Sequence, residues 1–313
     1  FKRFIKWLLF WKCKKLNMIV CVDRVREKED KFLDTIYKSN PKYEYVKSDT
    51  IDLSNKSPRV FRGITRMPTI KQCVDNNIDF YYVDTGYMGC YPVKKWQRFT
   101  KNNLQTLEHL NYNQLDFLTD TKVLKKRFKD IMNVDYDNYK PKRPVEGESI
   151  LVIPPSLNST RSLNIMNHID FEQEDYINFI TKEIRKYTDK KIIVRQKPNR
   201  KERTLNGQTL LHQLKKDKVH CLVAFNSIAA FEAIQEGYPA ITLGPNAASF
   251  LSEKELSNVE KPDFADDDKI REHSLYLSAC QFNIDEFKNG YAVKQIEQLQ
   301  HDQTYTNFKW SIV

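Results

Sequence analysis

Two small polar residues, Asn226 and Ser227, follow the apolar run VHCLVAF at 219–225. The run predicts a buried strand, and the segment after it predicts a helix over about 228–236 that ends before Gly237. Ser and Asn favour the first turn of a helix, where backbone amides can also meet an anion. The step between strand and helix, Asn226 and Ser227, is therefore predicted to bind a phosphate. The alternative interpretation is an ordinary capped helix.

Basic residues follow another predicted strand, KKIIVRQKP, and they are Arg195, Lys197, Arg200 and Lys201. A guanidinium binds phosphate through two parallel hydrogen bonds and a lysine adds a point charge. Arg195, Lys197 and Arg200 are accordingly predicted to bind a diphosphate. Glu232, on the helix after Ser227, is predicted to accept hydrogen bonds from ribose hydroxyls. The alternatives are a solvated basic loop and a solvent-facing helix carboxylate.

The elements that position these residues alternate between strands and helices. Residues 18–22 predict a strand and the following segment a helix to about Ser39; YEYVKSD, RVFRGIT and DFYYVDTGY predict further strands, and MPTIKQCVDNN a short helix. A second series begins at SILVIPPS and continues through KKIIVRQKP, VHCLVAF and PAITLG. Alternation of this kind predicts an α/β fold with parallel sheets.

A linker divides the two series, because YDNYKPKRPVEGES at 136–149 is rich in Pro and Lys and has no apolar period. The predicted domains are 18–140 and 141–300, followed by a tail, 301–313. The leader 1–17 is basic and aromatic, and its apolar part is too short for a membrane span. It has two remaining interpretations: a basic amphipathic helix, or upstream sequence before a natural start at Met18, which we favour.

The second half resembles the nucleotide-sugar half of GT-B glycosyltransferases, particularly capsular polysaccharide and Kdo transferases. The segments that carry the resemblance are IPPS, RQKP and FNSIAAFEAIQEGYPAITLG, within residues 148–250. It implies two Rossmann-like domains facing each other across a cleft, with the donor nucleotide in the C-terminal one and the acceptor in the N-terminal one. The family's His-Pro appears here as Lys197-Pro198 and its E-x7-E spacing is missing, so the subfamily and the stereochemistry do not carry over.

The resemblance also implies a carboxylate in the N-terminal half that deprotonates the acceptor hydroxyl. Asp84 ends the apolar part of the predicted strand DFYYVDTGY and precedes Thr85 and Gly86, which let a ligand approach the backbone. Asp23, at the end of the first predicted strand, is the rival candidate. Either aspartate could equally cap a helix or a turn.

Aromatic and basic residues interleave in GYMGCYPVKKWQRFTKNNLQ at 86–105, and those predicted to bind the acceptor are Tyr87, Lys94, Lys95, Trp96 and Arg98. Cations bind phosphates and aromatic rings stack on exposed bases, so this composition favours DNA. It is equally compatible with a sugar platform or a core with charged edges. In size, charge and plan the chain is similar to phage DNA glucosyltransferases, which implies 5-hydroxymethylpyrimidine in double-stranded DNA as acceptor, reached by base flipping.

Composition agrees with an anionic partner, since 51 Lys and Arg against 41 Asp and Glu give a net charge of +10, although a merely basic enzyme would look the same. The six cysteines form no C-x-x-C pair and predict reduced core thiols. No metal site is predicted, and the acidic run 266–268 is interpreted as a solvated loop. The only small molecule expected is a nucleotide-sugar, with a UDP-sugar first.

Two other functions remain open at this stage. A bacterial surface-glycan transferase would use a glycan acceptor and the leader as a peripheral membrane anchor. A non-catalytic nucleotide-binding or nucleic-acid-binding module would have the same sheet without turnover. A cytoplasmic location is expected, inside an infected host if the protein is encoded by a phage.

Overall fold

The computed structural model describes residues 18–22, 31–47, 51–89, 95–107, 109–144, 146–167, 170–196 and 209–300. It is a mixed α/β protein with parallel strands, as predicted, and it divides into two compact units. Unit 1 comprises the described residues of Phe1–Thr106, Leu110–Tyr136 and Leu275–Asn307. Unit 2 comprises those of Leu107–His109 and Asp137–Ser274.

Unit 1 is built on a six-stranded sheet in the order β10-β5-β4-β3-β1-β2. The strands are β1 (Ile19–Val22), β2 (Glu44–Lys47), β3 (Arg59–Arg62), β4 (Phe80–Thr85), β5 (Gln97–Lys101) and β10 (Gln281–Phe282). Strands β1 to β4 are parallel, whereas β5 runs antiparallel to β4 and β10 antiparallel to β5. The last strand therefore comes from residues that the sequence analysis grouped with the second half.

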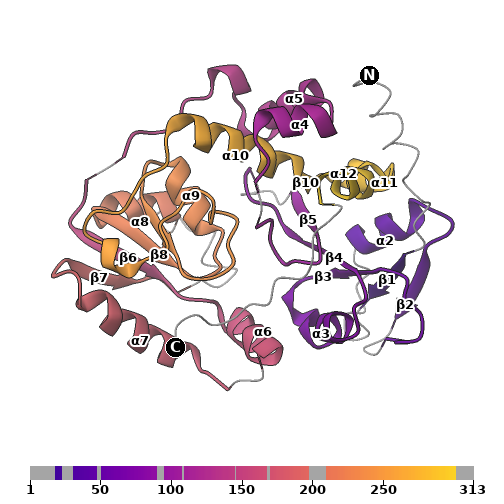
Figure 1. Cartoon of the computed structure of the whole chain (residues 1–313), viewed down its shortest axis with the longest axis horizontal. Helices are drawn as coiled ribbons and strands as arrows, with labels where there is room; N and C mark the ends of the chain where they lie inside the picture. The colour runs from indigo at the N-terminus through magenta and orange to yellow at the C-terminus, as the bar shows by residue number, and fades with distance from the viewer. Residues whose placement is uncertain are drawn as a thin grey trace. The chain divides into compact units, whose positions relative to one another are not determined.

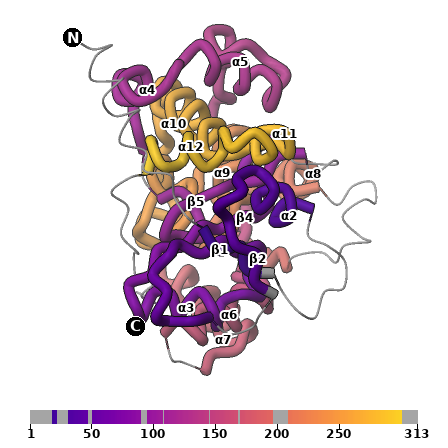
Figure 2. Tube along the Cα trace, turned by 90° about the vertical axis from the view of Figure 1, so that its right-hand side faces the viewer, coloured from indigo at the N-terminus to yellow at the C-terminus, as the bar shows by residue number. Residues whose placement is uncertain are grey.

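Helices cover both faces of the unit 1 sheet, with α2 (Lys31–Lys38) and α3 (Met67–Asp75) on opposite sides (Figures 1 and 2). The other helices of this unit are α4 (Tyr112–Leu118), α5 (Thr121–Met132), α11 (Ile284–Lys288) and α12 (Tyr291–Leu299). Local capping fixes where two of them begin: Asn111 and Gln114 form a capping box at α4, and Asp120 accepts from the Lys122 amide at α5.

Strand β5 has the sequence QRFTK, and all five of its side chains are buried although four are polar. The buried cations have partners within the unit. Arg98 Nη2 lies 3.0 Å from Asp84 Oδ2, and Lys101 Nζ lies 3.2 Å from Glu297 Oε1. Buried charges need such partners because transfer from water is costly. Strand β5 is therefore a core strand although its sequence is mostly polar.

Unit 2 is built on a four-stranded parallel sheet in the order β7-β6-β8-β9. Its strands are β6 (Ser149–Ile153), β7 (Lys191–Val194), β8 (Val219–Ala224) and β9 (Ala240–Thr242). Its helices are α6 (Leu157–Asn167), α7 (Gln173–Arg185), α8 (Leu210–Lys216) and α9 (Ala229–Gln235). Helix α10 (Asp267–Ala279) contributes residues to both units. Helix α7 lies on one face of the sheet and α8 and α9 on the other (Figure 1).

The order of the unit 2 strands creates a switch point between β6 and β8. The chain leaves β6 toward β7 on one side, and it leaves β8 toward β9 on the other. In open parallel sheets, ligands bind outside the carboxyl ends of the strands at such a point. The loops that follow β6 and β8 are therefore where a ligand is expected in this unit.

Candidate functional site at the carboxyl edge of the unit 2 sheet

The turn after β8 contains the predicted step, Asn226 and Ser227. Ser227 Oγ accepts from the amide of Ala229 at 3.3 Å, and the Ser227 carbonyl accepts from the amide of Ala230 at 3.2 Å. The amide of Phe231 donates to the Ile228 carbonyl at 3.0 Å. The expectation that first-turn amides await an anion is therefore wrong for these three amides, because the turn itself uses them. The N-cap is Ile228.

The turn after β6 lies across the switch point from this step. Ser156 Oγ lies 2.9 Å from Ser159 Oγ and accepts from the Ser159 amide at 3.3 Å, so it caps the start of α6. Gln173 Nε2 donates to the Pro155 carbonyl at 2.6 Å and fixes the preceding residues. Ser156 was missed from the sequence, although its S-x-x-S spacing is a capping signal.

Arg195 directly follows β7, and Glu232 lies on α9, the helix after β8. The amide of Arg195 donates to the Val152 carbonyl at 2.8 Å, so Arg195 lies beside the end of β6, and its Nη1 donates to Gln213 Oε1. Glu232 lies in the first turn of α9. The two side chains interact electrostatically. They converge because the chain segments that follow β7 and β8 leave the same edge of the parallel sheet.

The environment changes the protonation of both groups. Burial raises the pKa of Glu232 to about 7, against the opposing charge of Arg195. Burial likewise lowers the pKa of the Arg195 guanidinium, and Glu232 opposes that change. A carboxyl group that titrates near neutrality beside a cation is typical of functional sites. Glu232 can therefore accept hydrogen bonds or exchange a proton at neutral pH.

Asn246 fixes this edge from the loop after β9. Its side chain is fully buried, and its Nδ2 donates to the Ser227 carbonyl at 2.8 Å and to the Phe225 carbonyl at 3.4 Å. Its Oδ1 accepts from the Ala248 amide at 2.9 Å. Gly244 lies close by, and a Cβ there would be 2.5 Å from the Phe225 ring. Asn246 was missed from the sequence, where its place after Gly-Pro was the available signal.

Four predicted site residues, Lys197, Arg200, Asp23 and Lys94, lie outside the described residues. Asp84 is described, at the carboxyl end of β4 in unit 1.

Three donors engage the Asp84 carboxylate. Its Oδ2 accepts from Arg98 Nη2 and from the Tyr82 hydroxyl, both at 3.0 Å, and its Oδ1 accepts from the Thr85 amide at 2.7 Å. These bonds hold the carboxylate in place. The catalytic role of Asp84 stays a prediction, and its local role is to neutralise Arg98.

Three of the predicted acceptor-binding residues are buried in unit 1: Tyr87, Trp96 and Arg98. The hydroxyl of Tyr87 accepts from the Thr106 amide at 2.7 Å. Arg98 Nε donates to a backbone carbonyl at 3.0 Å, and its guanidinium lies over the Tyr87 ring. Lys95 is exposed, with its amine 5.1 Å from the centre of the Trp96 ring. These contacts give Tyr87 and Arg98 a structural role, and Trp96 is part of the buried core.

Two histidines form a buried pair elsewhere in unit 2. His273 Nε2 lies 2.6 Å from the Ala247 carbonyl oxygen, which only accepts, so the proton of neutral His273 is on Nε2. Its Nδ1 then accepts from Nδ1 of His109 at 3.1 Å. Phe250 stacks on His109 at 3.9 Å, and Glu272 lies 4.0 Å from His109 Nε2. Burial lowers the pKa of His109 to about 4 and of His273 to about 3.

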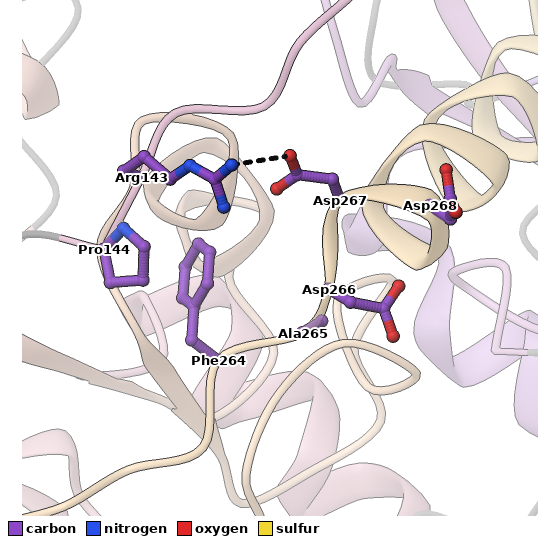
Figure 3. A pocket seen from close by; sticks show the side chains of 7 residues that line it. All are labelled: Arg143, Pro144, Phe264, Ala265, Asp266, Asp267 and Asp268. Atoms are coloured by element: carbon purple, nitrogen blue, oxygen red, sulfur yellow. Dashed lines mark ion pairs between the residues drawn. The ribbon is translucent and has the colours of Figure 1, made fainter.

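The acidic run lines an open hollow of about 430 Å³ together with Arg143, Pro144, Phe264 and Ala265 (Figure 3). Asp266 Oδ1 accepts from the Lys269 amide at 2.8 Å, Asp267 pairs with Arg143 at 3.7 Å, and Asp268 pairs with Arg271 at 3.4 Å. The three carboxylates thus engage three different partners. Among the residues that the structure describes, no His, Cys, Asp and Glu side chains gather into a group able to hold a metal ion.

Comparison with known proteins finds no matching family model. No curated protein matches the sequence. Two solved structures that the chain is similar to are described as "Thermosulfurimonas dismutans KpsC, beta Kdo 2,4 transferase" and "Thermosulfurimonas dismutans KpsC, beta Kdo 2,7 transferase". The first has a TM-score of 0.45 at 10% identity and covers 86% of this chain and 92% of its own. The second has 0.44 at 12% identity and covers 89% and 99%. Similarity of this extent assigns no activity.

Within the described ranges, no helix combines the length and the apolar character needed to cross a membrane.

Proposed function

We propose that the protein is a glycosyltransferase that moves a sugar from a nucleotide-diphosphate sugar to a hydroxyl group. The observation that carries the proposal is the Arg195 and Glu232 pair at the switch point of a parallel sheet. Arg195 supplies a cation for the phosphates, and Glu232 supplies oxygen acceptors for the ribose hydroxyls. Ser227 and Asn226 contribute polar groups from the same edge.

The segments that resemble GT-B glycosyltransferases also support the proposal. IPPS begins at the last residue of β6, RQKP follows β7, and FNSIAAFEAIQEGYPAITLG contains the turn after β8 and all of β9. All three place polar or charged residues after the carboxyl ends of neighbouring strands. An ordinary sheet needs no cation and no carboxyl group of raised pKa at this edge.

In the proposed reaction, the acceptor oxygen forms a bond to the anomeric carbon while the bond from that carbon to the diphosphate oxygen breaks. The acceptor proton passes to a base, for which Asp84 and Asp23 are the candidates. The nucleotide diphosphate leaves with its negative charge beside Arg195. A UDP-sugar is the first donor to test, and the reaction requires no further cofactor.

Two acceptor classes follow from the proposal. The 5-hydroxymethylpyrimidine of DNA was favoured by the interleaved aromatic and basic residues at 86–105, but Tyr87, Trp96 and Arg98 are buried. Their burial removes the main observation that favoured DNA as acceptor. A surface glycan is therefore supported at least as well as DNA. The positive net charge of +10 suits either anionic acceptor.

The experiment incubates the protein with UDP-, GDP- and CMP-sugars and with three acceptors: hydroxymethylcytosine DNA, hydroxymethyluracil DNA and a bacterial glycan acceptor. Mass spectrometry of the digested products detects transfer as a gain of one sugar mass. Transfer that is lost in Arg195→Gln and retained in Arg161→Gln, an exposed arginine of the same unit, supports the proposal. If the donor binds but neither transfer nor slow donor hydrolysis is detected, the result would favour the non-catalytic module.

A further inference from the structure

A lysine and two hydroxyl groups meet beside β9 in unit 2. Lys254 Nζ donates to Thr242 Oγ1 at 2.8 Å and to Ser252 Oγ at 3.0 Å, and the two hydroxyl oxygens are 2.5 Å apart. Thr242 ends β9, and the residues around Glu253 run parallel to β9 through a bridge to Ile241. Since β9 is parallel to the other strands, this cluster lies at the same edge of the sheet as the Arg195 and Glu232 pair.

The cluster contains more donors than it uses. An ammonium group has three N–H donors and each hydroxyl has one O–H donor. Two N–H groups donate to the hydroxyls, and one hydroxyl donates to the other. One N–H and one O–H therefore have no acceptor within the cluster. A group that accepts from both would complete it.

The positive charge of Lys254 also has no close counter-charge. No carboxylate of the described residues lies within ion-pair distance of its Nζ. Glu253 Oε1 instead accepts from the backbone amides of Lys254 at 2.6 Å and Glu255 at 3.2 Å. Partial removal from water lowers the pKa of Lys254 to about 8, against the opposing influence of Glu253. The residue as a whole is exposed, so a ligand can reach it.

We propose that Lys254, Thr242 and Ser252 bind a phosphate-type oxyanion. An oxyanion has several acceptor oxygens and a negative charge, so it meets both the unused donors and the uncompensated ammonium. The proposal does not depend on the glycosyltransferase proposal, because its residues and its charge are separate from Arg195 and Glu232. The phosphate could belong to a larger ligand or be free in solution, and the test distinguishes these sources.

The test measures the rate at which acetic anhydride modifies Lys254 in the full chain, with mass spectrometry of the peptides. Inorganic phosphate, compared with chloride at equal ionic strength, should slow the modification of Lys254 severalfold. Lys218 is the internal control, because its amine already pairs with Glu148 at 2.9 Å. The rate at Lys218 should change little. An equal change at both lysines, or no change at Lys254, would overturn the proposal.

Variants test the hydroxyl groups and identify the source of the phosphate. In Ser252→Ala, the phosphate concentration that protects Lys254 should rise about tenfold, which is the effect of one lost hydrogen bond to a charged group. The melting temperature of this variant should not fall by much. Unchanged protection in this variant would contradict the assigned geometry. Protection by UDP that disappears in Arg195→Gln would assign the phosphate to a donor nucleotide. Protection by inorganic phosphate that persists in Arg195→Gln would assign a separate site.

Discussion

Acidification should destabilise the protein through the buried pair of His109 and His273. In the folded state the hydrogen bond between their Nδ1 atoms requires the acceptor, Nδ1 of His273, to carry no proton. Protonation of either ring would place two N–H groups against each other or a charge in a site with little water. The unfolded chain has no such restriction, so it takes up protons at a higher pH than the folded protein does.

The magnitude follows from the difference in pKa between the two states. An exposed histidine has a pKa of about 6.5, whereas burial lowers the pKa to about 4 for His109 and about 3 for His273. At pH 5 each ring therefore costs about 2 kcal/mol of the free energy of unfolding relative to pH 8, or about 4 kcal/mol for the pair. The free energy of unfolding has its full value above the pKa of the histidines in the unfolded chain, about 6.5, and it falls as the pH drops below that value.

The assay is urea unfolding at pH 8 and pH 5 of the wild type and of the double variant His109→Gln, His273→Gln. Other groups that titrate in this range, such as Glu232, contribute to both proteins and cancel in the comparison. The pH-dependent loss should be smaller in the double variant by about 4 kcal/mol. His212→Gln, at an exposed histidine on α8, should leave the pH dependence unchanged. Equal pH dependence in the double variant and the wild type would refute the reasoning.

Three further predictions concern the sheet edges. Because burial raises the pKa of Glu232 to about 7, the ionised form destabilises the fold as the pH rises, and Glu232→Gln should increase the free energy of unfolding by about 3 kcal/mol at pH 8 but by less than about 1 kcal/mol at pH 5. Gly244→Ala should cost about 1–3 kcal/mol by calorimetry, because its Cβ would meet the fully buried Phe225 ring. Asp84→Asn should abolish turnover with near-normal donor affinity if Asp84 is the base; since it also leaves the buried Arg98 without its charge partner, a lower melting temperature with normal turnover would assign Asp84 a structural role alone.

The sequence predicted most strands of both parallel arrays, because each is a short apolar run between turn signals. Arg195 and Glu232 were singled out separately, for a diphosphate and for ribose hydroxyls, and their mutual interaction is known only from the structure. Strand β5 was missed because basic residues such as Arg98 and Lys101 are typical of a surface segment, and their charge partners cannot be recognised from the local sequence. Asn246 was missed because its hydrogen bonds join residues about twenty positions away, and no local pattern records them.

The short strand β10 affects how unit 1 can fold. Gln281 pairs with Arg98, and its side chain bonds the amides of Tyr87 and Met88 at 2.7 and 3.1 Å. During synthesis, β5 leaves the ribosome long before this partner exists, so the growing chain exposes an unpaired strand edge for most of its translation. Such an edge can pair with other chains. A chain shortened before β10 should therefore aggregate during expression, even though most residues of the first sheet are present.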